Sequence, residues 1–469
     1  MEKHSVSPAR LRWLANLSLA KKSIASNLLA WLAIAGAAIE FLFRAIARSN
    51  GGLLTDLAAP YVSTRLWLRH ANPYDAHIFM PTWDASGAPL LGLPEYVSGA
   101  HSVYPPITLI PMIPFALLRW PSAVNLFLVC GILLYALCVV GLLRLGWPEY
   151  KQWREFASDP LALLFVAFAL GLAPIHTAFA SQNIVLGAAC AAILTICLLS
   201  RQDRTKTDGL WPWLMPWVAG ALITLSVCLK PTTGVFLFPW LVRERRWRLI
   251  AGVIVACGVI AVVSLEPLMM HQGTAWLASY RFNVANLFTN GGNADVSHMN
   301  WENTDHIDLQ LVLFAMIQSR PVSSAIAVAI YGAILLIFMT LAGWYRSGGK
   351  TVGKAGDLRL LVAAGSLTLG LLPVYSRIYS AIVLLPLVLW CFRHLRFAAA
   401  KWLLALLCGF LVNSSAIVRA FFSHSRFALD MPRTWDATVG GHVCWLLLVI
   451  GALLTWAMKQ QSREALKGY

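Results

Sequence analysis

The chain alternates long apolar stretches with short polar connections from residue 28 to residue 458. Several of these stretches approach the roughly 20 residues that a helix needs to cross a bilayer. Repeated apolar runs of this length are not typical of soluble globular domains. The pattern therefore predicts an all-α polytopic membrane protein.

The apolar runs predict about twelve spanning helices. They are expected near residues 28–46, 122–143, 161–174, 183–199, 212–229, 231–242, 248–269, 324–344, 360–374, 377–392, 398–421 and 440–458. Residues 103–118 are left out because Pro105, Pro106, Pro111 and Pro114 would break a helix repeatedly, which favours an interfacial or re-entrant element. Residues 309–318 are left out because they are too short to span comfortably.

The distribution of charged residues predicts how this bundle is oriented in the membrane. The N-terminus and six connections, at residues 144–154, 201–206, 243–248, 346–359, 393–401 and 459–467, hold 25 of the 37 Lys and Arg residues. Basic residues gather on the cytoplasmic side of membrane proteins. We therefore expect both termini, including the segment 1–27, to be cytoplasmic. The connections 49–121, 270–323 and 423–439 are then extracytoplasmic.

Composition narrows the class further. The chain has 469 residues, of which 58% are hydrophobic and 12% charged, and its net charge is +16. Because the basic residues are spread through short loops rather than gathered on one soluble face, we expect a lipid bilayer and no nucleic acid as partner. The nine cysteines show no metal-type or redox-type spacing and are interpreted as core or lipid-facing residues. No flexible linker is evident, so residues 1–469 are expected to form a single integral membrane domain.

With this topology, several polar residues at helix ends fall on the outer face. They are Asp56, His101, Tyr104, Gln182, Asn183, Lys230, Arg377 and Tyr379. Each has an ordinary alternative: a carboxylate or an amide can cap a helix, a lysine can snorkel to the headgroups, and a tyrosine or histidine can lie at the interface. The concentration of a carboxylate, two cations and an amide pair near one membrane surface favours a functional site.

Such a set suits chemistry on a lipid-linked phosphate. Lys230 and Arg377 can neutralise a phosphate as it departs, and Asp56 can accept a proton from an attacking hydroxyl group. Tyr104, Gln182, Asn183, Tyr379 and His101 can contact the sugar or the acceptor. No P-loop or Rossmann glycine pattern and no metal-ligand spacing appear, so we expect no cofactor and no metal.

At these residues the chain resembles the polyprenyl-phosphate-sugar-dependent membrane glycosyltransferases of the C superfamily (GT-C). The nearest group is the mannosyltransferase-like proteins of family 87. The resemblance rests on weak motifs in order along the chain: Thr55-Asp56, Asn72-Pro73-Tyr74, Tyr104-Pro105-Pro106, Ser181-Gln182-Asn183, Lys230-Pro231 and Arg377-Ile378-Tyr379. It implies a GT-C fold and transfer of a sugar from a lipid phosphate. It also implies that the acidic residue after the first helix, Asp56, is the base. Ser376 and Ser380 stand where relatives often have His and Asp.

The sequence thus predicts an inverting hexosyltransferase. It would move a hexose, with mannose favoured, from a polyprenyl phosphate to a lipid, glycan or other acceptor on the extracytoplasmic side of a bacterial inner membrane. A transporter or flippase of lipid-linked or anionic substrates is the alternative from another class, and it would require paired repeats and polar residues near mid-membrane. A non-catalytic family member is a third alternative, raised by Ser376 and Ser380.

Overall fold

The computed structural model describes residues 8–49, 56–88, 102–202, 210–288, 294–298, 303–344, 352–373, 375–422 and 425–466. All regular elements in these ranges are helical. The one β-type pairing recorded there is an isolated antiparallel bridge between His306 and Arg377. The predicted all-α class is confirmed.

The helices of the first part of the chain are α1 (Pro8–Phe41), η1 (Leu42–Ala47), α2 (Ala58–Leu68), α3 (Ala76–Ser86), η2 (Pro106–Thr108), α5 (Leu109–Ala116), α6 (Trp120–Gly146), α7 (Trp153–Ser158), α8 (Pro160–Gly171), α9 (Ala173–Ala180), α10 (Val185–Gln202), α11 (Leu210–Leu229), α12 (Pro231–Val235) and α13 (Phe238–Arg243). Those that follow are α14 (Trp247–Gln272), α15 (Ala275–Leu287), η3 (Asn303–Asp305), α16 (Leu309–Ile317), α17 (Arg320–Trp344), α18 (Val352–Leu369), η4 (Ile378–Leu384), α19 (Leu385–Arg393), α20 (Ala398–Leu407), η5 (Cys408–Leu411), α21 (Ser414–Phe422), α22 (Arg426–Asp430), α23 (Pro432–Trp435), η6 (Asp436–Gly440) and α24 (His442–Leu466).

Six helices within the described residues are long and apolar enough to cross a membrane. They are Ala25–Ala47, Trp120–Gly146, Pro160–Ala180, Trp247–Gln272, Arg320–Ala342 and His442–Gln461. A seventh candidate is the pair Ala398–Leu411 and Ser414–Phe422, which is bent by 57°. All twelve predicted segments are largely helical, but several are short or broken, so the number twelve stays a prediction.

The proline-rich stretch and helix α2 pack together in the expected outer region. The proline-rich stretch forms the short helices η2 and α5, of which α5 packs against α2 and η2 against α14. Helix α2 is mostly buried rather than lying on the surface, as Tyr61, Leu66 and Trp67 illustrate. The tyrosine hydroxyl of Tyr61 donates a hydrogen bond of 2.9 Å to the Leu118 carbonyl, which ties α2 to the end of α5.

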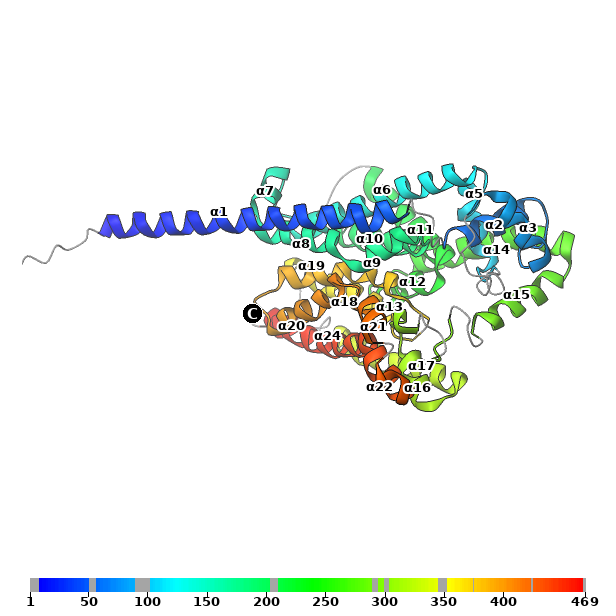
Figure 1. Ribbon diagram of the computed structural model, residues 1–469. Coiled ribbons are helices and arrows are strands. Elements are labelled where there is room, and N and C mark those ends of the chain that lie inside the picture. The colour runs from blue at the N-terminus through cyan, green and yellow to red at the C-terminus, as the bar shows by residue number, and fades with distance from the viewer. Residues whose placement is uncertain are drawn as a thin grey trace, which may run out of the picture.

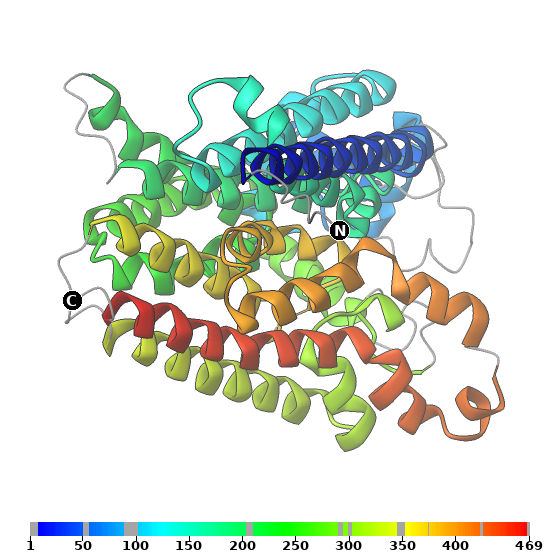
Figure 2. The same ribbon diagram turned by 90° about the vertical axis from the view of Figure 1, so that its left-hand side faces the viewer.

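The helices run lengthwise through one elongated bundle. In Figure 1, the start of α1 and the end of the chain lie on one side of the molecule, together with α7 and α20. Helices α2, α3 and α15 lie on the opposite side. In Figure 2, α17 and α24 lie alongside each other, in keeping with the contacts between them. The chain ends and the α2–α3–α15 region are thus separated by the length of the bundle.

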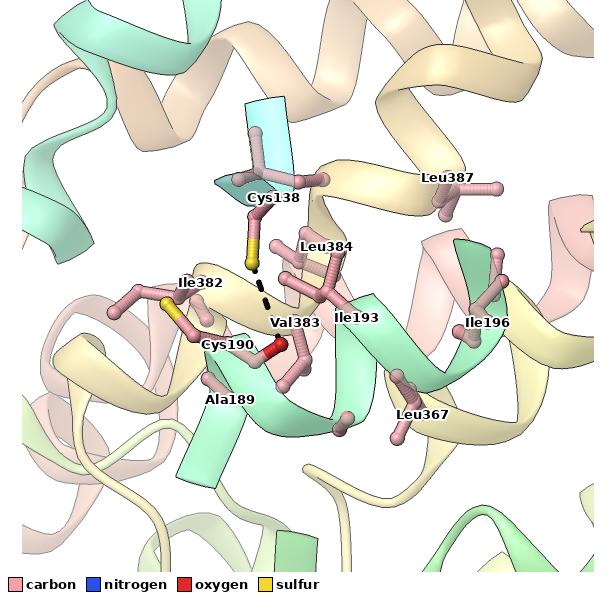
Figure 3. Packing of buried hydrophobic residues seen from close by; sticks show 14 of the residues in the cluster. Cys138, Ala189, Cys190, Ile193, Ile196, Leu367, Ile382, Val383, Leu384 and Leu387 are labelled. Carbon is pink, nitrogen blue, oxygen red and sulfur yellow. Dashed lines mark hydrogen bonds between the residues drawn. The ribbon is translucent and has the colours of Figure 1, made fainter. Parts of the chain in front are cut away.

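The core lies where α10 crosses the helices η4 and α19 of the C-terminal part. Figure 3 shows Ile193 and Ile196 of α10 among Ile382, Leu384 and Leu387. The Cys138 thiol of α6 donates a hydrogen bond of 3.3 Å to the Cys190 carbonyl at the same place. All nine cysteines are free thiols, and most are buried. This apolar core joins the first and last parts of the chain, so breaks in their helices can meet.

Local sequence signals explain where the short helices begin. Asp75, Asp159 and Asp308 stand at the N-caps of α3, α8 and α16, and each carboxylate accepts a hydrogen bond from the backbone two residues later. Aspartate at this position satisfies an N–H group that the helix leaves unpaired. After Lys230, Pro231 starts α12 with its preset φ angle. A Cβ atom at Gly234 would lie 2.7 Å from the Val227 backbone nitrogen, so this tight reversal requires glycine.

Candidate functional site

A turn between α9 and α10 meets the segment that precedes α2. Gln182 adopts a left-handed conformation with φ 51°, which ends α9 and turns the chain toward α10. The Asp56 backbone N–H donates a hydrogen bond of 2.8 Å to the Ser181 carbonyl. The side-chain amide of Asn183 donates to the Asp56 carboxylate at 2.5 Å. Asn183 therefore holds the ionised carboxylate in one orientation.

Gln182 fixes the turn that carries Asn183. Its side-chain amide donates a hydrogen bond of 2.8 Å to the Ser49 carbonyl at the end of the first long helix. Gln182 and Asn183 are both almost fully buried. Gln182 thus ties the turn to the first helix, and Asn183, rather than Gln182, carries the recorded contact with the acid.

Tyr104 joins the same group from the proline-rich connection. Its hydroxyl donates a long hydrogen bond of 3.4 Å to the Asp56 carbonyl, and its own carbonyl accepts one of 3.0 Å from Tyr74. Burial raises the pKa of Tyr104 well above its ordinary value, the charge of Asp56 raises it further, and Arg377 lowers it. Tyr104 is therefore close enough to both Asp56 and Arg377 to feel their charges.

Lys230 lies at the break between α11 and α12, where its backbone leaves the helical conformation. Its ammonium donates a hydrogen bond of 2.7 Å to the Ser380 hydroxyl and lies 5.7 Å from the Tyr379 ring centroid. Burial lowers the pKa of Lys230 to about 8, the charge of Asp308 opposes that decrease, and Arg377 adds to it. Lys230 remains mostly charged at neutral pH but titrates just above it.

Arg377 belongs to an extended segment between α18 and η4. Its guanidinium carbon lies 5.9 Å from the Tyr375 ring centroid. Its backbone pairs with His306, and the Ile307 N–H donates a 2.9 Å hydrogen bond to the Ser376 carbonyl. The segment that carries Arg377 is therefore held by residues 306–309.

A small pocket adjoins Lys230 on the side of Ser376 and Ser380. Thr232, Thr233, Phe236 and Gly370 are among its other lining residues. Its free volume is about 10 Å³, which is close to the space that one water molecule requires. A phosphate group does not fit in this pocket.

The structure thus brings together most of the predicted site residues. Asp56, Tyr104 and Asn183 share direct hydrogen bonds, and Lys230 contacts Tyr379. Gln182 lies one residue from this network, and Arg377 lies within electrostatic range of Tyr104 and Lys230. His101 lies outside the described residues.

Asp308 and His306 were not among the predicted site residues. Asp308 is fully buried and accepts hydrogen bonds from the Ser376 and Gln310 backbone N–H groups at 2.9 and 3.0 Å. His306 is also buried, and its Nδ1 atom lies 3.5 Å from Asp308 Oδ2. The sequence carried one signal for Asp308, an aspartate directly before the apolar run at residues 309–317. That signal points to a helix cap and not to a site.

Among the described residues, no group of three or more His, Cys, Asp and Glu side chains is arranged to hold a metal ion. The polar groups of the site are instead one carboxylate with its amide donor, and two cations beside a buried carboxylate. This donor set can orient a carboxylate and surround an anion.

Comparison with known proteins gives the family. Neither a search of curated proteins nor a search of solved structures found a match. The sequence profile described as glycosyltransferase family 87 matches residues 103–363, more than half of the chain. This range contains Tyr104, Gln182, Asn183, Lys230 and Asp308, whereas Asp56 and Arg377 lie outside it. The resemblance noted from the motifs is confirmed, and the chain belongs to glycosyltransferase family 87.

Proposed function

We propose that this glycosyltransferase transfers a hexose from a polyprenyl-phosphate donor to a hydroxyl group of a lipid or glycan acceptor. Mannose is the first sugar to test. The observation that carries the proposal is the meeting of Asp56 and Arg377 at half-buried Tyr104, with Lys230 next to the same Arg377 and over the Tyr379 ring. A carboxylate on one side and cations on the other suit displacement of a phosphate from a sugar.

In the proposed reaction the acceptor hydroxyl oxygen attacks the anomeric carbon, and Asp56 takes the hydroxyl proton. The bond between the anomeric carbon and the phosphate oxygen breaks, and its electron pair leaves with the polyprenyl phosphate. Lys230 and Arg377 stabilise the charge that develops on that phosphate. A single direct displacement inverts the configuration at the anomeric carbon.

The remaining residues take supporting roles in the proposal. Asn183 orients the Asp56 carboxylate through its 2.5 Å hydrogen bond. Tyr104 and Tyr379 line the path of the sugar or the acceptor, Gln182 braces the turn that carries Asn183, and His101 remains a candidate contact from the sequence. Because the pocket beside Ser376 and Ser380 accommodates about one water molecule, the donor phosphate approaches Lys230 from the side of Tyr104 and Arg377.

The proposal includes a topology. The single integral domain crosses a bacterial inner membrane twelve times, with both termini cytoplasmic and the site extracytoplasmic. Six helices of spanning length support the membrane location. The separation of the chain ends from α2, α3 and α15 in Figure 1 supports the assignment of opposite faces.

The test is incubation of the purified protein with radiolabelled polyprenyl-phosphate mannose and membrane extracts. A labelled product is expected from the wild-type protein and not from Asp56→Asn, which keeps the size of the side chain and removes its basicity. Asp75→Asn is the matched control, because Asp75 caps α3 at the same end of the bundle. Equal product from the wild-type protein and Asp56→Asn would reject Asp56 as the base. No product with any polyprenyl-phosphate hexose would reject the donor class.

A further inference from the structure

Asp308 is a buried charge that the proposed reaction does not use. Its side chain has no exposed surface. Each of its two oxygens accepts a backbone hydrogen bond, from Ser376 and from Gln310. Carboxylates are rarely buried in this way without a positive partner, because desolvation of the charge is costly. The position of Asp308 therefore requires a nearby cation.

The nearest titratable side chain lies within ion-pair distance but makes no hydrogen bond with it. His306 Nδ1 lies 3.5 Å from Asp308 Oδ2, and neither ring nitrogen of His306 has a hydrogen-bond partner among the described residues. The Cys444 thiol donates to the Asp308 backbone carbonyl and not to its carboxylate. The cations that remain are Lys230, whose protonation Asp308 favours electrostatically, and Arg377, on the segment that Asp308 binds.

Backbone pairing links Asp308 mechanically to these cations. The Ile307 N–H donates to the Ser376 carbonyl and the Leu309 N–H donates to the Leu372 carbonyl, both at 2.9 Å. The residue between them, Asp308, therefore faces the loop that carries Ser376 and Arg377. In η4, which follows that loop, Ser380 accepts the hydrogen bond from Lys230. Asp308 thus binds the segment that carries Arg377 and that continues to the Ser380 contact with Lys230.

The charges fit a single phosphate diester. Lys230 and Arg377 repel each other, which is why Arg377 lowers the pKa of Lys230. With Asp308 the group has a net charge of +1. A lipid-linked sugar phosphate is a diester with one negative charge, so it neutralises the group. We propose that Asp308 is the resting counter-ion of Lys230 and Arg377, which the phosphate of the lipid-linked donor replaces as their main partner. This inference rests on the proposed function.

In this arrangement Asp308 is a positioning residue, because it acts on the donor through Lys230 and Arg377. It keeps Lys230 protonated while the site is empty. It also repels the incoming phosphate. Removing its charge should therefore strengthen phosphate binding while Lys230 is protonated, and should let Lys230 lose its proton at a lower pH.

Asp308→Asn removes the charge together with one of the two backbone hydrogen bonds that Asp308 accepts. Asparagine caps a helix about as well as aspartate, and its side-chain oxygen still accepts a backbone hydrogen bond. The measurement is binding of a short-chain polyprenyl-phosphate mannose, a diester whose single charge does not change in this range, to the purified protein in nanodiscs between pH 6 and pH 9. Asp75→Asn is the matched control, since Asp75 caps α3 through a similar 3.0 Å hydrogen bond to the His77 N–H.

For the wild-type protein, affinity should fall as pH rises through about 8, the pKa of Lys230. For Asp308→Asn, binding should be at least threefold tighter than for the wild-type protein at pH 6.5. The decrease of affinity with rising pH should begin at least half a pH unit lower. In Lys230→Met this decrease should be absent, and it should also be absent in the double variant with Asp308→Asn. Asp75→Asn should follow the wild-type curve.

Uniformly weaker binding of Asp308→Asn at every pH would overturn the inference, because it would mean that Asp308 only shapes the loop. An unchanged curve would overturn it as well. If the wild-type protein binds no polyprenyl-phosphate hexose, the proposed donor is wrong and the inference fails with it. If the wild-type protein binds the lipid and Asp308→Asn behaves like it, the proposed function stands and only the inference is rejected.

Discussion

Replacing Asn183 with aspartate should remove most transfer activity at acidic pH while preserving the fold. Asn183 donates to the Asp56 carboxylate at 2.5 Å, and its side-chain oxygen accepts from the Val185 N–H at 2.8 Å. Aspartate keeps the second contact, which starts α10. It replaces the donor at Asp56 with a second carboxylate. Two carboxylates at this distance cannot both ionise readily, so they share a proton.

The size of the effect follows from the separation. Two like charges about 2.5 Å apart repel by roughly 6–7 kcal/mol at an effective dielectric constant of ~20, an upper bound for a partly exposed pair. A shift of two pH units corresponds to about 2.7 kcal/mol and lies well within this bound. We therefore expect kcat/KM to fall about 100-fold at pH values on the ascending limb, below the pKa of the base. We also expect the ascending limb of the pH–rate profile to move up by at least two pH units.

The assay is transfer from a radiolabelled polyprenyl-phosphate hexose, measured from pH 5 to pH 8, with donor binding and thermal unfolding recorded on the same samples. Donor binding should change less than threefold, because Asn183 has no recorded contact with either cation. Asn413→Asp is a matched control, since Asn413 also accepts from a helix N-terminus, at Ala416, without contacting Asp56. An ascending limb that stays at the wild-type pH, with near-normal kcat/KM, would refute the role of Asn183 and weaken that of Asp56.

Three further predictions test the site and the topology. Asp56→Asn should remain folded and inserted but lose transfer, whereas near-normal turnover would point to Asp75 or another acid of the outer loops. Lys230→Met should bind the lipid-phosphate donor at least tenfold more weakly, about 1.4 kcal/mol or more, with acceptor affinity less affected; a loss of thermal stability with unchanged donor affinity would make Lys230 structural. In intact cells an impermeant thiol reagent should label cysteines placed at Ser98, Asn293 and Arg433, and not those placed at Gln152, Thr205 and Gly349. Labelling at both 98 and 152 would mean that the proline-rich segment spans the membrane.

The helices could be predicted because apolar runs and prolines act locally. The long runs at 122–143 and 248–269 appear as α6 and α14 with ends a few residues away. The segments at 231–242 and 398–421 were harder. Each reads as one apolar run, yet the first divides into α12 and α13 and the second bends by 57°. Whether such a run stays straight depends on how it packs against neighbouring helices. The hydropathy of a segment does not identify those neighbours.

The site could be predicted to the extent that its residues stand at helix ends. Asp56, Asn183 and Lys230 were found because each polar residue interrupts an apolar pattern. Asp308 was missed because the pattern around it has a sufficient local explanation, a cap for α16. Its contact with Ser376 joins residues 68 positions apart, and the sequence next to either residue does not indicate such a contact.

The way the site is assembled explains why it draws on so many parts of the chain. A membrane helix satisfies its own backbone and presents apolar side chains, so polar chemistry has to collect where helices end or break. Asp56 precedes α2, Asn183 lies between α9 and α10, Lys230 lies between α11 and α12, and Arg377 precedes η4. The packing of α10 against η4 brings two of these breaks together through apolar contacts alone. The residues matched by the family profile supply Asn183, Lys230 and Asp308, and the flanking segments add Asp56 and Arg377. A substitution in the apolar core between α10 and η4 should therefore change the spacing between Asn183 and Arg377 without touching either.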